Sequence, residues 1–209
     1  LYRNGNYEGS VMAGPYGSPD HFVIRAPNNG RIKDFTVSPD GCAAAYIASN
    51  EGEILYCYDL YTSDIREVAN NVTSFQWAPM GGKIAYTKEI PPEDPQIGKA
   101  VRRIIIYDTT REIHSFLNDQ AVLNEWDASW SSDGKQLVFA GQSEDGSSDI
   151  WVSDLSGGTP IQVTYGADAG GALHAPAFSP DKQYVAYLNL RESCATLSTI
   201  DLKSGVVSL

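Results

Sequence analysis

A short turn motif recurs along this chain and constrains its fold more than any other feature. Its first clear copy is Val37-Ser38-Pro39-Asp40-Gly41, and further copies begin at Trp77, Trp130 and Phe178. An aspartate that ends an apolar run follows each copy, at Asp59, Asp108, Asp154 and Asp201. Counted from residues 39, 79, 132 and 180, the gaps to these aspartates are 20, 29, 22 and 21 residues. Two markers in phase indicate a tandem structural repeat.

Residues 35–70 show the repeat unit in full. Apolar and aromatic runs predict strand a at 35–37, strand b at 43–48, strand c at 54–59 and strand d at 65–69. We expect the Ser-Pro-Asp-Gly segment to form the turn between strand a and strand b. Proline presets the φ angle that a turn needs, and glycine accepts the left-handed conformation. The same order of strands is expected in units 71–120, 121–172 and 173–209. No stretch of ten or more residues has helical periodicity.

Residues 1–34 form an incomplete unit. We expect strands at 10–13 and 21–25, and a returning strand at 31–33 after the turn Asn28-Asn29-Gly30. Asn-Gly is a strong hairpin signal because both residues tolerate positive φ. The first strand of this unit is missing from the pattern.

Four-stranded antiparallel units of about 40 residues in tandem predict an all-β fold, a β-propeller, with residues 1–209 as one domain. Its blades are expected at about 1–34, 35–70, 71–120, 121–172 and 173–209. Two interpretations stay open. The five units close a ring alone, or the chain is part of a six- or seven-bladed ring.

The charge balance excludes some partners. The chain has 15 basic and 26 acidic residues, a net charge of −11, which should repel nucleic acid and anionic lipid. No apolar run approaches the roughly 20 residues that span a bilayer, so we expect no membrane insertion. Cys42 and Cys57 fall on neighbouring strands where a disulfide could form, but buried apolar roles for the cysteines are favoured, and no zinc spacing occurs.

Every long connection is expected at one end of the blades, where the b–c and d–a connections lie. We call this end the b–c/d–a face; it comprises segments 88–102, 117–127, 141–148 and 165–175. Tight turns form the other end, and function concentrates in long loops. The candidate partner-binding residues on the b–c/d–a face are Glu93, Asp94, Arg102, Arg103, Trp126, Asp127, Asp145, Asp168 and His174. For any one of them, a merely solvated loop residue is the competing interpretation.

No catalytic constellation is apparent. Gly141-Gln142-Ser143-Glu144-Asp145 fails the nucleophile-elbow pattern at its last position and joins two antiparallel strands. His21, His114 and His174 lie in three different units, so no metal-ligand pair is expected. Residues 145–149 faintly resemble a calcium loop but lack its other carboxylates, and a polar hairpin loop is favoured. We therefore expect no enzyme activity, no metal and no cofactor, with calcium as a weak alternative.

Two repeated residue types are expected to be structural. Trp77, Trp130 and Phe178 share one place in strand a, which favours packing between blades over ligand stacking in a channel. The aspartates that end each strand c are expected to accept backbone N–H bonds in the following turn.

Residues 149–164, Asp-Ile-Trp-Val-Ser-Asp-Leu-Ser-Gly-Gly-Thr-Pro-Ile-Gln-Val-Thr, and residues 175–181, Ala-Pro-Ala-Phe-Ser-Pro-Asp, resemble the repeat of the TolB-type β-propellers, which are WD40-like. The resemblance covers roughly residues 35–209. Met80 replaces the usual Asp in one turn, Ser132 replaces Pro in another, and Lys182 replaces Gly in a third.

The resemblance implies a six-bladed propeller that acts as a periplasmic scaffold and binds a peptidoglycan-associated lipoprotein. Related repeats also form the gating propellers of prolyl-oligopeptidase-like hydrolases. The first hypothesis is therefore a non-catalytic periplasmic or extracellular propeller that docks a protein or peptide. The alternative is an accessory propeller of a larger hydrolase, which a Gly-x-Ser-x-Gly segment elsewhere in the gene product would reveal.

Overall fold

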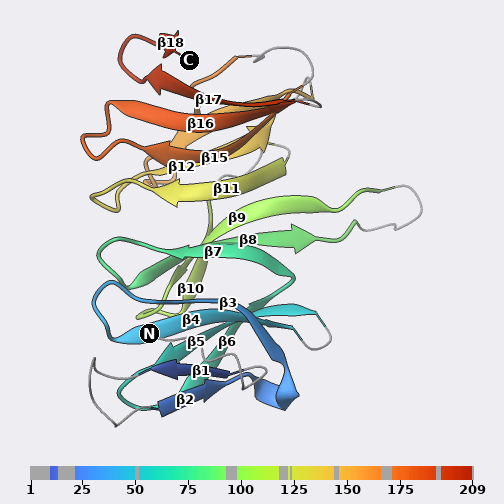
Figure 1. Cartoon of the computed structure of the whole chain (residues 1–209), viewed down its shortest axis with the longest axis vertical. Coiled ribbons are helices and arrows are strands. Elements are labelled where there is room, and N and C mark those ends of the chain that lie inside the picture. The colour runs from blue at the N-terminus through green and yellow to red at the C-terminus, as the bar shows by residue number, and fades with distance from the viewer. Residues whose placement is uncertain are drawn as a thin grey trace. The chain divides into compact units, whose positions relative to one another are not determined.

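A computed structural model describes residues 10–13, 22–49, 52–92, 98–117, 122, 124–143, 146–165, 171–191 and 194–208. The chain divides into two compact units, Leu1–Val72 and Thr73–Leu209. All regular structure in the described residues is β-strand, apart from one short 3-10 turn (Figure 1). No helix among these residues is long and apolar enough to cross a membrane.

The first compact unit holds a four-stranded antiparallel sheet in the order β3-β4-β5-β6 and a two-stranded sheet, β1-β2. The strands are β1 (Ser10–Ala13), β2 (Phe22–Arg25), β3 (Arg31–Val37), β4 (Ala43–Ser49), β5 (Glu53–Asp59) and β6 (Ile65–Asn70). Its core is aromatic: Tyr46 and Tyr56 stack with ring centroids 5.3 Å apart. Ile24 and Ile32 belong to the same buried cluster, so β2 packs against the four-stranded sheet.

The hairpin predicted at Asn28-Asn29-Gly30 is wrong. Residues 27–29 form a 3-10 turn in which Gly30 N donates to Pro27 O (3.0 Å). Only Asn28 has positive φ, whereas the hairpin turn needs two such residues, and Gly30 is extended. Residues 31–33 accordingly begin β3 and pair with β4, with Arg31 opposite Ser49.

The second compact unit holds three four-stranded antiparallel sheets in the orders β7-β8-β9-β10, β11-β12-β13-β14 and β15-β16-β17-β18. The first contains β7 (Val72–Trp77), β8 (Lys83–Ile90), β9 (Val101–Asp108) and β10 (Ile113–Phe116). The second contains β11 (Asn124–Trp130), β12 (Leu137–Gln142), β13 (Ser148–Ser153) and β14 (Ile161–Gln162). The third contains β15 (Ala172–Phe178), β16 (Tyr184–Arg191), β17 (Cys194–Asp201) and β18 (Val207–Ser208).

Several segments expected to be loops are strand. β8 and β9 take both ends of the expected 88–102 connection and project beyond the neighbouring strands (Figure 1). β11 and β15 begin earlier than expected, so Trp126, Asp127 and His174 lie in strands rather than in d–a loops. A register shift interrupts each of these two strands, between Trp126 and Ser129 and between His174 and Ala177. Such bulges add one unpaired residue to a strand and bend it locally.

The sheets of the second compact unit pack face to face, and β12 shows how. Leu137 and Phe139 belong to a buried cluster shared with β8 and β9, whereas Val138 and Ala140 belong to one shared with β16 and β17. Alternate residues of one strand thus enter two cores. Trp130 is buried in the first cluster, and Phe178 packs against the second, which confirms the packing role predicted for these aromatics.

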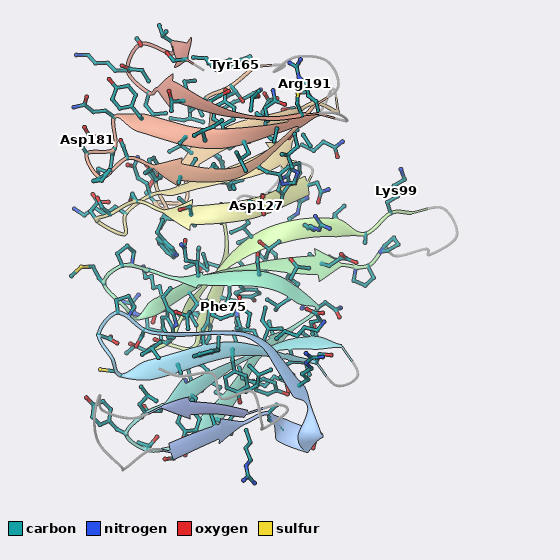
Figure 2. All side chains as sticks on the ribbon, in the orientation of Figure 1. Phe75, Lys99, Asp127, Tyr165, Asp181 and Arg191 are labelled. Carbon is teal, nitrogen blue, oxygen red and sulfur yellow. The ribbon has the colours of Figure 1, made fainter. Side chains whose placement is uncertain are left out.

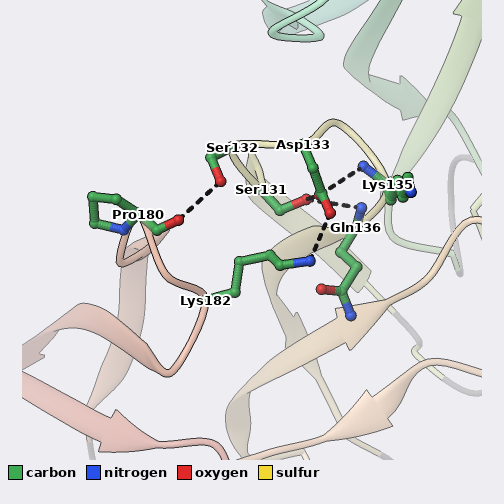
Figure 3. A network of polar contacts seen from close by, with 7 residues as sticks. All are labelled: Ser131, Ser132, Asp133, Lys135, Gln136, Pro180 and Lys182. Atoms are coloured by element: carbon green, nitrogen blue, oxygen red, sulfur yellow. Dashed lines mark hydrogen bonds and ion pairs between the residues drawn. The ribbon is translucent and has the colours of Figure 1, made fainter.

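The recurrent turn residues form hydrogen bonds that explain their repetition. Ser131 Oγ donates to Asp133 Oδ1 (2.7 Å), which also accepts from Lys135 N (3.2 Å), while Ser131 Oγ accepts from Gln136 N (3.0 Å; Figure 3). The Ser38–Asp40 and Ser179–Asp181 pairs repeat this pattern. Met80 lacks the carboxylate, yet the backbone bond from Gly81 N to Ala78 O is kept at 2.9 Å.

The aspartates that end the strands β5, β9, β13 and β17 also have the predicted role. Asp59 Oδ1 accepts from Tyr61 N and Thr62 N at 2.8 and 2.9 Å. Asp108, Asp154 and Asp201 accept N–H groups of the following turn in the same way. These bonds hold the pKa of Asp59 and Asp201 below the ordinary value, and the Ser156 hydroxyl together with the Ser156 N–H lowers the pKa of Asp154.

Candidate functional site

A recess of about 370 Å³ opens on the first strands of all three sheets in the second compact unit. Its lining residues are Ser74, Phe75, Gln76, Ala85, Thr87, Asp127, Ala128, Ser129, Ala175 and Pro176. Eight of the ten occupy matching places, since they lie one to three residues before Trp77, Trp130 or Phe178 in β7, β11 and β15. Figure 2 marks Phe75 on β7 and Asp127 on β11. The repeat therefore builds one shared cavity from equivalent strand positions.

Three predicted residues, Trp126, Asp127 and His174, come together beside this recess. His174 Nδ1 lies 2.9 Å from Asp127 Oδ2, which also accepts the backbone N–H of Ala175 at 3.1 Å. Trp126 Nε1 donates to the carbonyl of Leu173 at 3.0 Å, and its ring lies 6.1 Å from that of His174. The side chains of His174 and Asp127 are 36% and 39% exposed, so the pair is reachable from solvent.

The bulges place these groups. Asp127 and Ala175 both have positive φ, 53° and 48°, at matching positions of β11 and β15. Aspartate tolerates this conformation better than most residues do. Because the bulge changes the direction of the strand, Asp127 both lines the recess and reaches the backbone of β15.

Arg102 and Arg103 lie at the same end of β9 but engage different groups. Arg102 N donates to Asn124 Oδ1 (2.7 Å), and its guanidinium makes a loose, exposed 4.0 Å contact with Glu89. Arg103 donates to the carbonyl of Val122 and lies 3.9 Å from Glu125 Oε1. Neither arginine lines the recess.

Glu125 was missed by sequence reasoning. Its side chain is 1% exposed, and Oε2 accepts from the backbone N of buried Ile104 at 2.7 Å, which ties β11 to β9. The sequence predicts a loop over residues 117–127, where an acidic residue is unremarkable. Glu125 directly precedes Trp126, in a stretch where polar and apolar residues alternate. This alternation is the signal in the sequence that indicates a strand here.

The faint calcium loop at 145–149 contains a buried, hydrogen-bonded carboxylate. Asp149 accepts from Ser143 Oγ (2.9 Å), Ser147 Oγ (2.8 Å) and Thr164 Oγ1 (3.0 Å). Thr164 Oγ1 in turn accepts from Ile150 N (2.9 Å), so the cluster fastens the start of β13. No group of three or more potential metal ligands occurs within the described part of the chain.

The remaining chemically active side chains are separate from the recess. His114 Nδ1 lies 3.0 Å from Tyr86 Oη, and the ring stacks on Tyr107 at 4.8 Å. Partial burial, together with Lys88 nearby, lowers the pKa of His114. The thiols of Cys42, Cys57 and Cys194 are free, and burial raises the pKa of Cys57 to about 11. The expectation of burial is correct for Cys57 but wrong for Cys42, which lies in an exposed turn, and for Cys194 at the start of β17.

The predicted site residues thus separate into three groups. Trp126, Asp127 and His174 meet beside the recess, and Arg102 and Arg103 lie with Asn124 and Glu125. Glu93, Asp94, Asp145 and Asp168 lie outside the described residues, as does His21.

Consecutive four-stranded antiparallel sheets packed face to face, with their first strands lining a common recess, are the blades of a β-propeller. Comparison with solved structures makes the class more specific: the blades have the TolB-like propeller fold. No protein-family model and no curated protein sequence matches the chain.

TolB from Acinetobacter baumannii aligns with a TM-score of 0.64 at 16% identity, over 95% of this chain and 48% of its own. A putative TolB from Agrobacterium tumefaciens aligns with a TM-score of 0.64 at 20% identity, over 97% of this chain and 74% of its own. A prolyl endopeptidase aligns with a TM-score of 0.63 at 17% identity, over 91% of this chain and 30% of its own. The chain therefore spans about half of the Acinetobacter protein, and identities this low support the fold alone.

Proposed function

We propose that this chain is a non-catalytic binding propeller that docks a protein or peptide partner on its b–c/d–a face. The observation that carries the proposal is the recess formed by equivalent positions of β7, β11 and β15, with the Asp127–His174 pair beside it. A concave site that combines apolar walls with a few polar groups is the usual form of a binding pocket.

The contrast between the two ends of the blades supports this choice of face. At the end that carries the tight turns, the recurrent aspartates and serines are used in hydrogen bonds within their own turns. Those residues are explained by folding. Near the opposite end, Asp127, His174 and the Arg102 guanidinium are partly exposed and are not required by the repeat.

No catalysis, metal or cofactor is part of this proposal. Ser143, in Gly141-Gln142-Ser143, donates to buried Asp149, and no histidine within the described residues contacts it. His114 is engaged by Tyr86 and Tyr107. The resemblance of the repeat to TolB-type propellers favours a periplasmic or extracellular location.

A capture experiment tests the proposed face. The chain is used as bait in an extract of the organism it comes from. The amount of partner protein captured is compared between the Arg102→Glu and Arg111→Glu variants. Arg102 lies on the b–c/d–a face, whereas Arg111 lies in the exposed turn after β9 at the other end of the same sheet. Capture should fall with Arg102→Glu and persist with Arg111→Glu. The reverse result, or equal capture by both variants, contradicts the proposal.

The match to a prolyl endopeptidase favours a second candidate, an accessory propeller that gates access to a hydrolase domain. Sequencing of the complete gene product separates the candidates. A downstream Gly-x-Ser-x-Gly nucleophile segment, together with hydrolysis of chromogenic peptide substrates by the whole protein, would establish the gating role. A complete gene product without such a segment supports the binding module.

A further inference from the structure

We propose that the recess binds a cationic side chain, lysine or arginine, with Asp127 as the counter-charge. This inference rests on the proposed function, because it names the chemistry by which a partner peptide would enter the site.

Asp127 is the one ionisable residue among the ten that line the recess. The Oδ2 atom of Asp127 accepts hydrogen bonds from His174 Nδ1 and from the Ala175 N–H. These two bonds fix the orientation of the carboxylate. Within the described residues, no hydrogen bond or ion pair reaches the other oxygen, Oδ1. A carboxylate that is oriented by two donors and keeps one oxygen available can accept a charge-assisted hydrogen bond from a ligand.

The rest of the lining suits the apolar stem of a basic side chain. Phe75, Ala85 and Ala128 offer apolar surface on β7, β8 and β11, and Pro176 adds the β15 side. Lysine and arginine bury their methylene stems against such surface while the charged head keeps a polar partner. The ring of Phe75 can also receive a cation on its face.

Neighbouring charges favour a cation over an anion. Arg103 is directed to Val122 and Glu125, and Arg102 makes its side-chain contact with Glu89, so these two arginines serve other groups. The chain as a whole carries a net charge of −11, which attracts cationic ligands. A volume of about 370 Å³ lies near the lower end of the range for ligand pockets, so one side chain fits better than a folded segment.

Solution NMR with blocked amino acids tests this directly. The isotope-labelled full chain is titrated with Nα-acetyl-lysine N-methylamide and its arginine equivalent, with norleucine as the uncharged match and glutamate as the anionic one. Amide shifts should be confined to residues 74–76, 127–129 and 174–175 and should appear with the two basic probes only. Equal shifts with norleucine, or no shift with any probe, overturn the proposal.

Asp127→Asn is the decisive variant. Asparagine also tolerates positive φ and can still accept the Ala175 N–H, so the bulge should persist while the charge is lost. Binding of the lysine probe should weaken about tenfold or more, whereas Glu67→Gln, which removes a charge from exposed β6, should leave it unchanged. Equal binding by Asp127→Asn and the native chain overturns the proposal.

A second variant keeps the proposal testable if Asp127→Asn fails to fold. Ser129→Lys places a competing ammonium in the recess and should abolish binding of the lysine probe while the spectrum stays dispersed. Unchanged binding by a folded Ser129→Lys variant overturns the proposal. If the basic probes do not bind but a partner protein is captured, this inference is wrong and the proposed function stands. If the basic probes bind but no partner is captured, the proposed function is wrong and the cation site stands.

Discussion

Lys182 Nζ lies 2.6 Å from Asp133 Oδ2, which joins the turn before β16 to the turn before β12 (Figure 3). Beside it, Ser132 Oγ donates to the carbonyl of Pro180 at 3.0 Å. Lys182 and Ser132 are two of the positions at which this chain departs from its own repeat. Here the departures link two blades, whereas the consensus residues Gly and Pro could make neither side-chain contact.

The Lys182→Gly variant tests whether the ion pair with Asp133 offsets the backbone strain at Lys182. Lys182 has a φ of 61°, a conformation that costs a residue other than glycine about 1 kcal/mol, so glycine relieves strain but loses the ion pair. Salt screens the ion pair and leaves the strain, so Lys182→Gly should melt above the native chain in about 1 M NaCl. Its advantage should shrink or reverse in low salt. Lys182→Met, which keeps the strain, should melt below the native chain at low salt.

Thermal melts of the three proteins at both salt concentrations check this prediction. A native chain that stays more stable than Lys182→Gly in high salt would show that the ion pair is not what offsets the strain.

The turn aspartates predict how stability depends on pH. Backbone N–H groups of Ser204 and Lys203 hold the pKa of Asp201 below its ordinary value. A carboxyl group with a lowered folded-state pKa stabilises the fold above its unfolded pKa of about 3.9. That stability is lost as the pH falls through the folded pKa. Asp201→Asn should therefore be less stable than the native chain near neutral pH, and the difference should vanish in acid.

Urea unfolding from neutral pH to about pH 2 measures the difference. Asp59→Asn should behave in the same way, because Asp59 makes the equivalent bonds to Tyr61 and Thr62. A difference between native and variant chains that stays constant with pH would show that these carboxylates do not carry the effect.

Buried Glu125 should matter far more for stability than exposed Glu89. Glu125→Ala leaves the N–H of fully buried Ile104 without this acceptor, which should cost about 1–3 kcal/mol. Glu125→Gln keeps an acceptor and should cost less. Glu89→Ala, which removes the exposed 4.0 Å contact with Arg102, should cost below about 0.5 kcal/mol. Equal losses for Glu125→Ala and Glu89→Ala in denaturant unfolding would contradict the buried role.

Gly141 is required by close packing rather than by backbone conformation. A Cβ at Gly141 would overlap Cγ1 of fully buried Val122 and stand 3.2 Å from the Asn124 carbonyl. Gly141→Ala should therefore destabilise the chain by about 1–3 kcal/mol. Gly158→Ala is the matched control, because its nearest neighbours are 3.9 Å away, and it should be nearly neutral. Chemical unfolding of both variants gives the comparison, and similar midpoints would be evidence against the clash.

The sequence allowed the blade repeat to be predicted because its turn chemistry is local. Serine, aspartate and glycine within five residues satisfy one another, as Ser131, Asp133 and Gly134 do, so the pattern is visible in one dimension. The site was less visible because it depends on bulges. At Asp127 and Ala175 the chain takes positive φ without glycine, so neither residue type signals the register shift that interrupts its strand.

Trp126, Asp127 and His174 lie in the first halves of β11 and β15, and a binding role for this face stays a prediction. Their meeting could not be predicted. It depends on how β11 and β15 of two blades pack, which involves residues 47 and 48 positions apart.

Hydrogen–deuterium exchange on the captured complex tests the binding-propeller account most directly. The account predicts that the partner slows exchange at 98–103, 124–129 and 172–176, while the turns at 79–82, 132–136 and 180–183 exchange as in the free chain. Protection confined to those turns, with none along the first halves of β11 and β15, would contradict it.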